Sequence, residues 1–121
     1  MESRPDAGSN CTLDERRVDG ISVVRVTGVV DMLTAPDLGK AIAEAAKSSP
    51  TAVIVDMTAV EFLASAGMGV LIAAQDELAP AVRFAVVAEG PATSRPLKLV
   101  GVTDVVDLYP TLAEALAALR S

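Results

Sequence analysis

The chain has 121 residues and a formal net charge of −6, and this length fits one compact domain. It contains no histidine and one cysteine, so a Ser-His-Asp triad, an imidazole zinc site and an internal disulfide are all excluded. The excess of acidic residues argues against direct binding to nucleic acid. We therefore expect a cytoplasmic domain that is not an enzyme and that holds neither a cofactor nor a metal ion.

The beginning of the chain differs in composition from the rest. Residues 1–12 are polar and contain Pro5 and Gly8, which predicts a flexible N-terminal tail before a single domain at residues 13–121. The longest apolar stretch, residues 62–74, is interrupted by Ser65 and is too short to span a bilayer. We therefore expect neither a secretory signal nor a membrane span.

The domain is predicted to open with a β-hairpin. The segment Ile21–Thr27 is rich in β-branched residues, and Asp19-Gly20 before it is typical of a two-residue hairpin turn that links it to Leu13–Val18. A helix capped by Thr34 or Ala35 is expected next, because apolar residues then recur at helical spacing.

The second half of the domain is predicted to alternate strands and helices. The continuous apolar run Ala52–Asp56 predicts a strand covered on both faces, and a helix that begins at Ser65 and ends before Pro80 follows it. The remaining predicted elements are a strand at 82–87, a helical stretch at 90–101, a strand at 105–108 and a C-terminal helix that starts with a capping box at 111–114. The resulting order ββαβαβαβα indicates an α/β fold in which helices pack on a mixed sheet of about five strands.

Ser65 is the strongest candidate for a functional residue. It stands where an apolar segment becomes a glycine-containing helix, and its side-chain oxygen is expected to accept a hydrogen bond from a free amide of the first helical turn. Gly67 and Gly69 follow inside the predicted helix, where each costs about 1 kcal/mol relative to alanine, so we expect tertiary contacts to favour both. The alternative is that Ser65 is a helix cap and nothing more.

The segment around Ser65 resembles a known regulatory motif. Residues 64–69 read Ala-Ser-Ala-Gly-Met-Gly, and the phosphorylatable segment of anti-sigma factor antagonists typically reads Asp-Ser-Ser/Thr-Gly-Leu-Gly. These antagonists are small proteins of the STAS domain family. Residues 27–31 are similar to the family's Gly-Glu-Leu/Ile-Asp loop, residues 53–56 to its central strand and residues 90–101 to its third helix. Residues 13–120 follow the family pattern in order, which implies a STAS-like fold.

The resemblance also implies a function in partner switching. The unmodified protein would bind an anti-sigma factor that has serine kinase activity and binds ATP, sigma factor would be released, and phosphorylation of Ser65 would end the complex. Asp31 would lie beside Ser65, although it could equally be an ordinary turn residue, and Met68 could equally belong to the core. Arg95 could contact an acidic partner or lie on a solvated helix face. The expected partner-binding residues are Asp31, Met32, Leu33, Thr34, Ala64, Ser65, Ala66, Gly67, Met68, Gly69 and Arg95.

Other functions fit parts of the same sequence. A STAS domain can also be a subunit of a membrane transporter complex, in which case a transporter would be the partner. A receiver domain would use Asp56, at the end of its predicted strand, as a phosphoacceptor, but the acidic pair and the lysine that such a site needs have no counterparts here. Weak self-association of the chain stays open as well.

Overall fold

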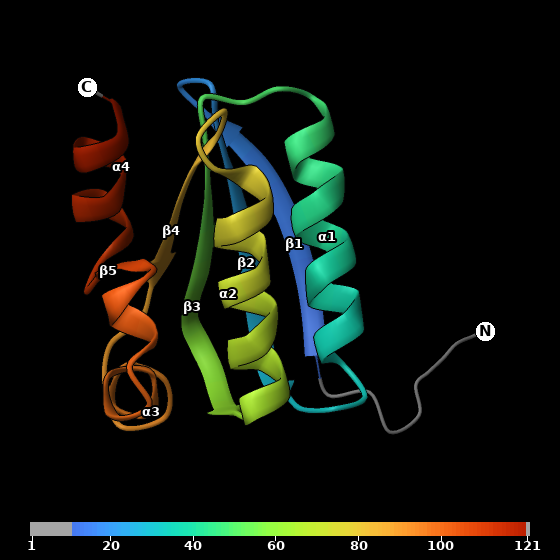
Figure 1. Cartoon of the computed structure of the whole chain (residues 1–121), viewed down its shortest axis with the longest axis vertical. Coiled ribbons are helices and arrows are strands. Elements are labelled where there is room, and N and C mark those ends of the chain that lie inside the picture. The colour runs from blue at the N-terminus through green and yellow to red at the C-terminus, as the bar shows by residue number, and fades with distance from the viewer. Residues whose placement is uncertain (1–10, 121) are drawn as a thin grey trace.

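The computed structural model describes residues 11–120, which form a five-stranded mixed sheet with helices on both faces (Figure 1). The strands lie in the order β1-β2-β3-β4-β5; β1 is antiparallel to β2, and the other neighbours are parallel. The elements are β1 Cys11–Val18, β2 Ile21–Val30, α1 Ala35–Lys47, β3 Ala52–Leu63, α2 Ser65–Leu78, β4 Arg83–Val87, α3 Ser94–Leu99, the 3₁₀ helix η1 Val102–Asp104, β5 Asp107–Tyr109 and α4 Leu112–Arg120. Apart from the short 3₁₀ helix, this is the predicted order.

The N-terminal hairpin has the predicted turn. Val18 pairs with Ile21, and the two residues between them, Asp19 and Gly20, have φ angles of 51° and 80°. Positive φ at both central positions is the requirement of a type I′ turn, whose twist matches that of the flanking strands. The first strand already begins at Cys11, so Cys11 and Thr12 are not part of a tail as predicted; the rest of the predicted tail lies outside the described residues.

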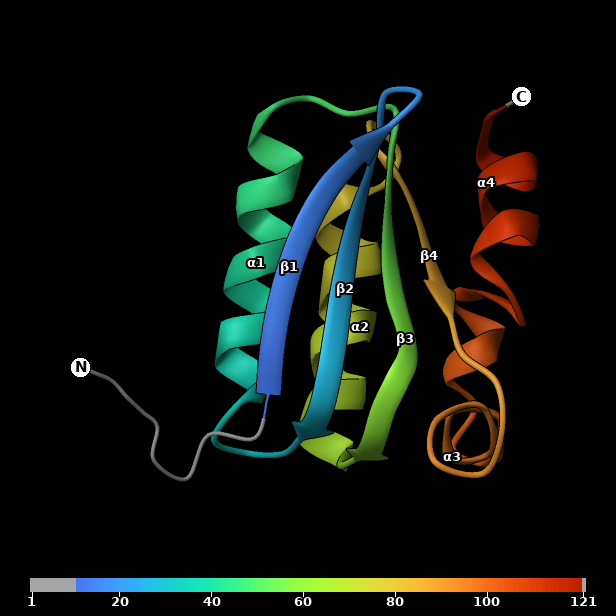
Figure 2. The same ribbon diagram turned by 180° about the vertical axis from the view of Figure 1, so that it is seen from behind.

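The core has two parts, one on each face of the sheet. Helices α1 and α2 cover one face, where the larger cluster includes Val24, Leu38 and Leu71. Helix α4 packs on part of the other face, next to β4 (Figure 2), where its Ala115 and Leu119 pack on strand residues such as Ile54. Because aliphatic side chains fill both layers, residues of the central strands are buried on either side, as the apolar run at 52–56 predicts.

All five strands differ in extent from their predictions, and β2 ends at Val30 rather than at Thr27. β3 continues past Asp56 to Leu63, because its pairing with β2 persists across two register shifts after its pairing with β4 has stopped at Asp56. One neighbour is then missing, so exposed polar residues such as Thr58 and Glu61 are accommodated in the strand. The last strand is Asp107–Tyr109 rather than 105–108, since η1 and its following turn occupy the preceding residues.

Candidate functional site

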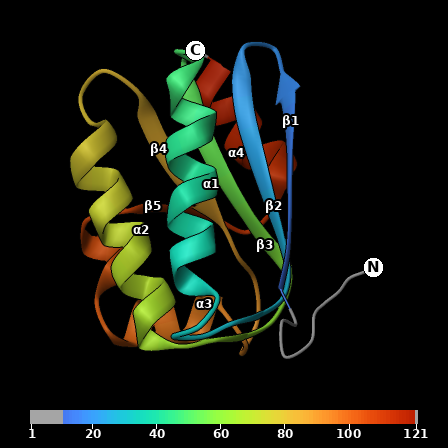
Figure 3. The same ribbon diagram turned by 90° about the vertical axis from the view of Figure 1, so that its right-hand side faces the viewer.

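The candidate site lies at the carboxyl edge of the sheet, where β2 leads to α1 and β3 leads to α2. The last residues of the two strands, Val30 and Leu63, are paired. Beyond this pair, the Ala64 amide donates a 2.8 Å hydrogen bond to the Val30 carbonyl. The residues that follow, Asp31 and Ser65, therefore leave the sheet at neighbouring positions. Figure 3 shows the starts of α1 and α2 and the short helix α3 at this same end of the molecule.

Ser65 is the first residue of α2 and is exposed. The residue at the N-cap position is Ala64, and no side chain caps the helix, so the expectation that the Ser65 oxygen caps it is wrong. The reason is a shift of one residue: Ala64 takes the extended backbone of a cap, with φ −84° and ψ 166°, and Ser65 is already helical. Within residues 11–120 the Ser65 hydroxyl makes no hydrogen bond, which leaves it free at the surface for chemistry.

Asp31 organises the loop between β2 and α1. Its Oδ1 atom accepts hydrogen bonds from the amides of Leu33 at 3.0 Å and Thr34 at 3.1 Å. The Thr34 hydroxyl in turn accepts from the Asp31 amide at 2.9 Å and donates to the Val29 carbonyl at 3.0 Å. The amide of Thr34 contributes most to holding the pKa of Asp31 below its ordinary value; desolvation opposes it, and the Thr34 hydroxyl and the Leu33 amide lower the pKa further by smaller amounts. Asp31 is thus a turn-forming carboxylate, and it lies at the edge that also carries Ser65.

The predicted partner-binding residues divide into an exposed group and a supporting group. Met32 and Leu33 are among the most exposed large apolar side chains, and Ser65 and Gly69 are exposed as well. Ala64 and Ala66 are half-buried. Thr34, Gly67 and Met68 are buried; Met68 is only 8% exposed and belongs to the core, the alternative that the sequence left open. These three buried residues support the exposed group from the interior of the domain.

The two glycines of α2 have different environments. A Cβ atom on Gly67 would lie 2.6 Å from Cγ1 of Val30 and 2.7 Å from Cδ1 of Leu63, so only glycine lets the helix pack this closely on the ends of the two strands. A Cβ atom on Gly69 would have no heavy atom within 4 Å. The expectation that tertiary contacts favour a glycine is therefore confirmed for Gly67 and wrong for Gly69.

Arg95 lies in α3, at the same end of the molecule as Ser65 (Figure 3). Its side chain lines a hollow of about 310 Å³ together with Phe62 and Leu63 from the end of β3. Phe62 is 55% exposed and was not among the predicted site residues. The signal available in the sequence was its position three residues before Ser65, in a chain that has two phenylalanines.

Asp56 does not have the position that a phosphoacceptor would need. It lies inside β3, not at its end, and is 5% exposed. Its Oδ1 atom accepts hydrogen bonds from the Thr58 amide at 3.0 Å and the Thr58 hydroxyl at 2.8 Å. The receiver-domain alternative is therefore wrong in its geometry. Among the described residues no cluster of three or more His, Cys, Asp or Glu side chains could hold a metal ion, and each helix there is too short or too polar to cross a lipid bilayer.

Comparison with known proteins gives the family. The STAS domain model matches residues 12–115. The anti-sigma-F factor antagonist RsfB of Mycobacterium tuberculosis is 37% identical over 118 residues, which cover 98% of this chain and 94% of RsfB. An anti-sigma factor antagonist from Mycobacterium paratuberculosis, known from a crystal structure, is 44% identical with a TM-score of 0.89, covering 97% of this chain and 100% of that one.

A more distant neighbour shares the fold alone. The structure of unphosphorylated SpoIIAA, a Bacillus anti-sigma factor antagonist, matches with a TM-score of 0.73 at 20% identity, covering 90% of this chain and 96% of that one. Sequence and fold therefore define the same class of protein. This chain belongs to the STAS domain family, as its sequence motifs predicted.

Proposed function

We propose that this chain is a cytoplasmic anti-sigma factor antagonist that is switched off by phosphorylation of Ser65. The unmodified protein binds an anti-sigma factor with serine kinase activity, and sigma factor is released; that partner binds the ATP. The observation that carries the proposal is the exposed Ser65 hydroxyl at the start of α2, which forms no hydrogen bond with any other residue of the described part of the chain and lies at the edge of the sheet that also presents Met32 and Leu33. The names of the relatives at 37% and 44% identity support the same function.

The position of Ser65 determines which property of the protein a phosphate would change. A phosphate adds about −1.5 to −2 charge at neutral pH, and the positive end of a helix dipole favours a negative charge by at most about 2 kcal/mol. Because Ser65 is exposed, the phosphate needs no buried space in the free protein. The fold is therefore expected to survive the modification.

The bound state responds differently to the same charge. Within a closed protein interface, an unpaired buried charge costs roughly 3 to 5 kcal/mol, and each 1.4 kcal/mol is about a factor of ten in affinity. Phosphorylation of Ser65 should therefore weaken the complex by about a hundredfold or more. The switch acts on docking and leaves the fold of the free protein intact.

The experiment uses the purified anti-sigma-F factor of Mycobacterium tuberculosis as the probe, since the relative RsfB is an antagonist of that class. Isothermal titration should show binding of the wild-type chain, and incubation with ATP followed by mass mapping should place the phosphate on Ser65. Ser65→Glu should bind at least about a hundredfold more weakly, whereas the matched control Thr51→Glu should bind normally, because exposed Thr51 precedes β3 at the opposite edge of the sheet.

Three results would count against the proposal. If Ser65→Glu binds as tightly as wild type, a negative charge at Ser65 does not control binding. If the phosphate is found on another residue, Ser65 is not the phosphorylation site. Copurification of the chain with a membrane transporter in place of an anti-sigma factor would favour the transporter-subunit alternative. Circular dichroism of each variant separates loss of docking from loss of folding.

A further inference from the structure

Apolar side chains from the end of β3 and from residues 91–99 form a hollow near Ser65. Its volume is about 310 Å³, and β3 and the α3 region contribute its walls. Phe62 is 55% exposed and Leu99 is 76% exposed, so both present apolar surface that the fold leaves uncovered. The residues that form the hollow include Phe62, Leu63, Pro91, Arg95, Pro96 and Leu99.

The rigidity of this hollow makes it suitable for docking. Pro91 and Pro96 have fixed φ angles, and Leu63 is anchored in the core cluster beneath the sheet edge. A hollow that exists before the partner arrives requires little ordering when the complex forms, so more of the contact energy contributes to affinity. Single exposed apolar residues are normal on protein surfaces, but here an aromatic and an aliphatic side chain face one cavity.

Arg95 gives the hollow a charge. Among residues 11–120 its guanidinium forms no ion pair or hydrogen bond, although the whole chain carries a net charge of −6. An adjoining hollow of about 590 Å³ also includes Arg95, together with Lys98 and one carboxylate, that of Glu89. Two cations and one carboxylate therefore line this second hollow, on a protein that is acidic overall. The charge complementary to Arg95 is a carboxylate, which a guanidinium can bind with two parallel hydrogen bonds.

We propose that this hollow receives an apolar side chain of the anti-sigma factor, and that an aspartate or glutamate beside that side chain pairs with Arg95. The inference rests on the proposed function and names a second contact for the same partner. Leu63 lines the hollow, and Ser65 follows it by two residues, so one docked protein covers both. Ser65 then controls whether the complex forms, and the hollow supplies part of its affinity.

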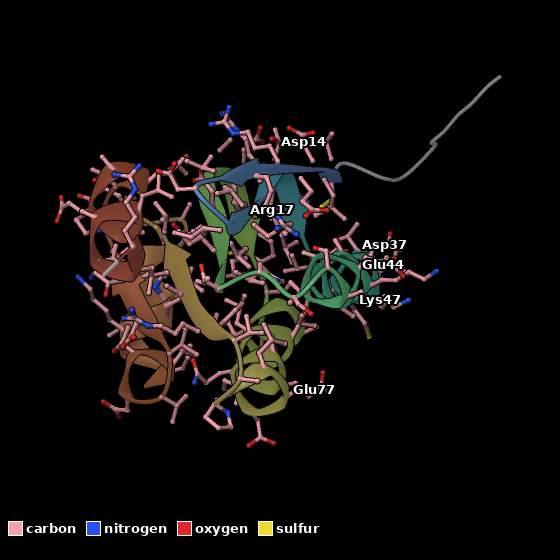
Figure 4. All side chains as sticks on the ribbon, turned by 90° about the horizontal axis from the view of Figure 1, so that it is seen from above. Asp14, Arg17, Asp37, Glu44, Lys47 and Glu77 are labelled. Atoms are coloured by element: carbon pink, nitrogen blue, oxygen red, sulfur yellow. The ribbon has the colours of Figure 1, made fainter. Side chains whose placement is uncertain are left out.

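The test measures binding of the Mycobacterium tuberculosis anti-sigma-F factor to four variants. Phe62→Ala and Leu99→Ala should each bind at least about tenfold more weakly, because truncation of a well-packed apolar anchor removes a large share of the affinity. Arg95→Gln should bind about fivefold more weakly and should make the affinity less sensitive to salt. The matched control is Lys47→Gln: Lys47 lies beside Glu44 at the far end of α1, and the two pair at 3.0 Å (Figure 4). Its binding should stay within about twofold of wild type.

The outcomes distinguish this inference from the function on which it rests. If wild type binds, Ser65→Glu fails to bind, and the Phe62, Leu99 and Arg95 variants bind normally, the hollow is not a contact and only the inference is overturned. If wild type does not bind the probe at all, both proposals are overturned. Since Phe62 and Leu99 are largely exposed, their truncation should leave thermal unfolding unchanged, and weaker binding by a fully folded variant supports the inference.

Discussion

The Ala64 amide donates a 2.8 Å hydrogen bond to the Val30 carbonyl, which fastens the start of α2 to the end of β2. Val30 also pairs with Leu63, so the two strand ends and the helix start form one rigid corner. Asp31 follows this corner in the β2–α1 loop and Ser65 follows it at the start of α2, although 32 residues of chain lie between Val30 and Leu63. Their proximity is therefore a property of the sheet and does not depend on contacts between the two side chains.

Gly67→Ala should destabilise the protein through this corner. The new Cβ atom would lie 2.6 Å from Val30 and 2.7 Å from Leu63, and both side chains are buried, so the helix or the strand ends must shift. Overpacking of this kind costs about 1 to 3 kcal/mol, while alanine regains about 1 kcal/mol of helix propensity. We expect a net loss of about 1 kcal/mol in the free energy of unfolding, measured by urea denaturation. A variant as stable as wild type would show that the corner can relax.

Gly69→Ala should have the opposite effect on stability. No heavy atom lies within 4 Å of the added Cβ, so the substitution gains helix propensity without a clash, and the free energy of unfolding should rise by about 1 kcal/mol. The same denaturation experiment checks it. The variant also tests the partner surface: weaker binding by this more stable protein would show that a partner approaches the backbone at Gly69. Unchanged binding would remove Gly69 from that surface.

Ala64→Asp should stabilise α2 and leave its start in place. Ala64 already has the extended backbone of an N-cap residue, but its methyl group cannot accept a hydrogen bond from the free amides of the first turn. An aspartate side chain at this position can, and replacing alanine by a good capping residue contributes about 1 kcal/mol. The expected result is a higher midpoint of urea unfolding, with Ala66→Asp as the control that places a carboxylate in the same turn away from the cap. No gain over that control would mean that the amides are already well solvated.

The sequence predicts those features that depend on local chemistry. Asp19-Gly20 specifies its turn because few residues tolerate positive φ at two successive positions, and the run 52–56 specifies a buried strand because both of its faces are apolar. The position of the α2 cap was missed by one residue, since Ala64 is held in the cap conformation by the backbone bond to Val30 and not by its side chain.

Other features depend on contacts that no local pattern contains. Thr58 and Glu61 interrupt the apolar run and conceal the extension of β3, which is maintained by pairing with β2. Met32 and Met68 are similar residues near the same site, but one is exposed and the other lies in the core, a difference that only the packing of α2 on the sheet decides. The hollow at Phe62 was missed because its other wall comes from residues 91–99, which fold against the end of β3.

Asp56→Ala should lower stability without affecting phosphorylation. The nearly buried carboxylate accepts two hydrogen bonds from Thr58, and hydrogen bonds to a charged group contribute about 1.5 to 3 kcal/mol. Because Thr58 is exposed and water can replace part of the loss, we expect a decrease of about 1 to 2 kcal/mol in the free energy of unfolding. Treatment with a kinase and ATP should label the folded variant to the same extent as wild type. Loss of labelling in the folded variant would return Asp56 to consideration as a phosphoacceptor.

Asp31→Asn should remove part of the pH dependence of stability. Hydrogen bonds from Thr34 and Leu33 lower the pKa of Asp31 in the folded protein, whereas an aspartate in the unfolded chain titrates near about 4. Between these two pKa values the unfolded state binds more protons, so stability rises with pH through that window. The charge therefore stabilises the fold at neutral pH, and its contribution is lost as pH falls from about 4 through the lower, folded pKa. Urea denaturation of both proteins from pH 7 downward should show the variant less stable at neutral pH, with the difference narrowing as pH falls below about 4. A difference that stays constant across this pH range would mean that the charge of Asp31 does not account for it. The cause would then be the changed hydrogen-bond geometry of the asparagine side chain.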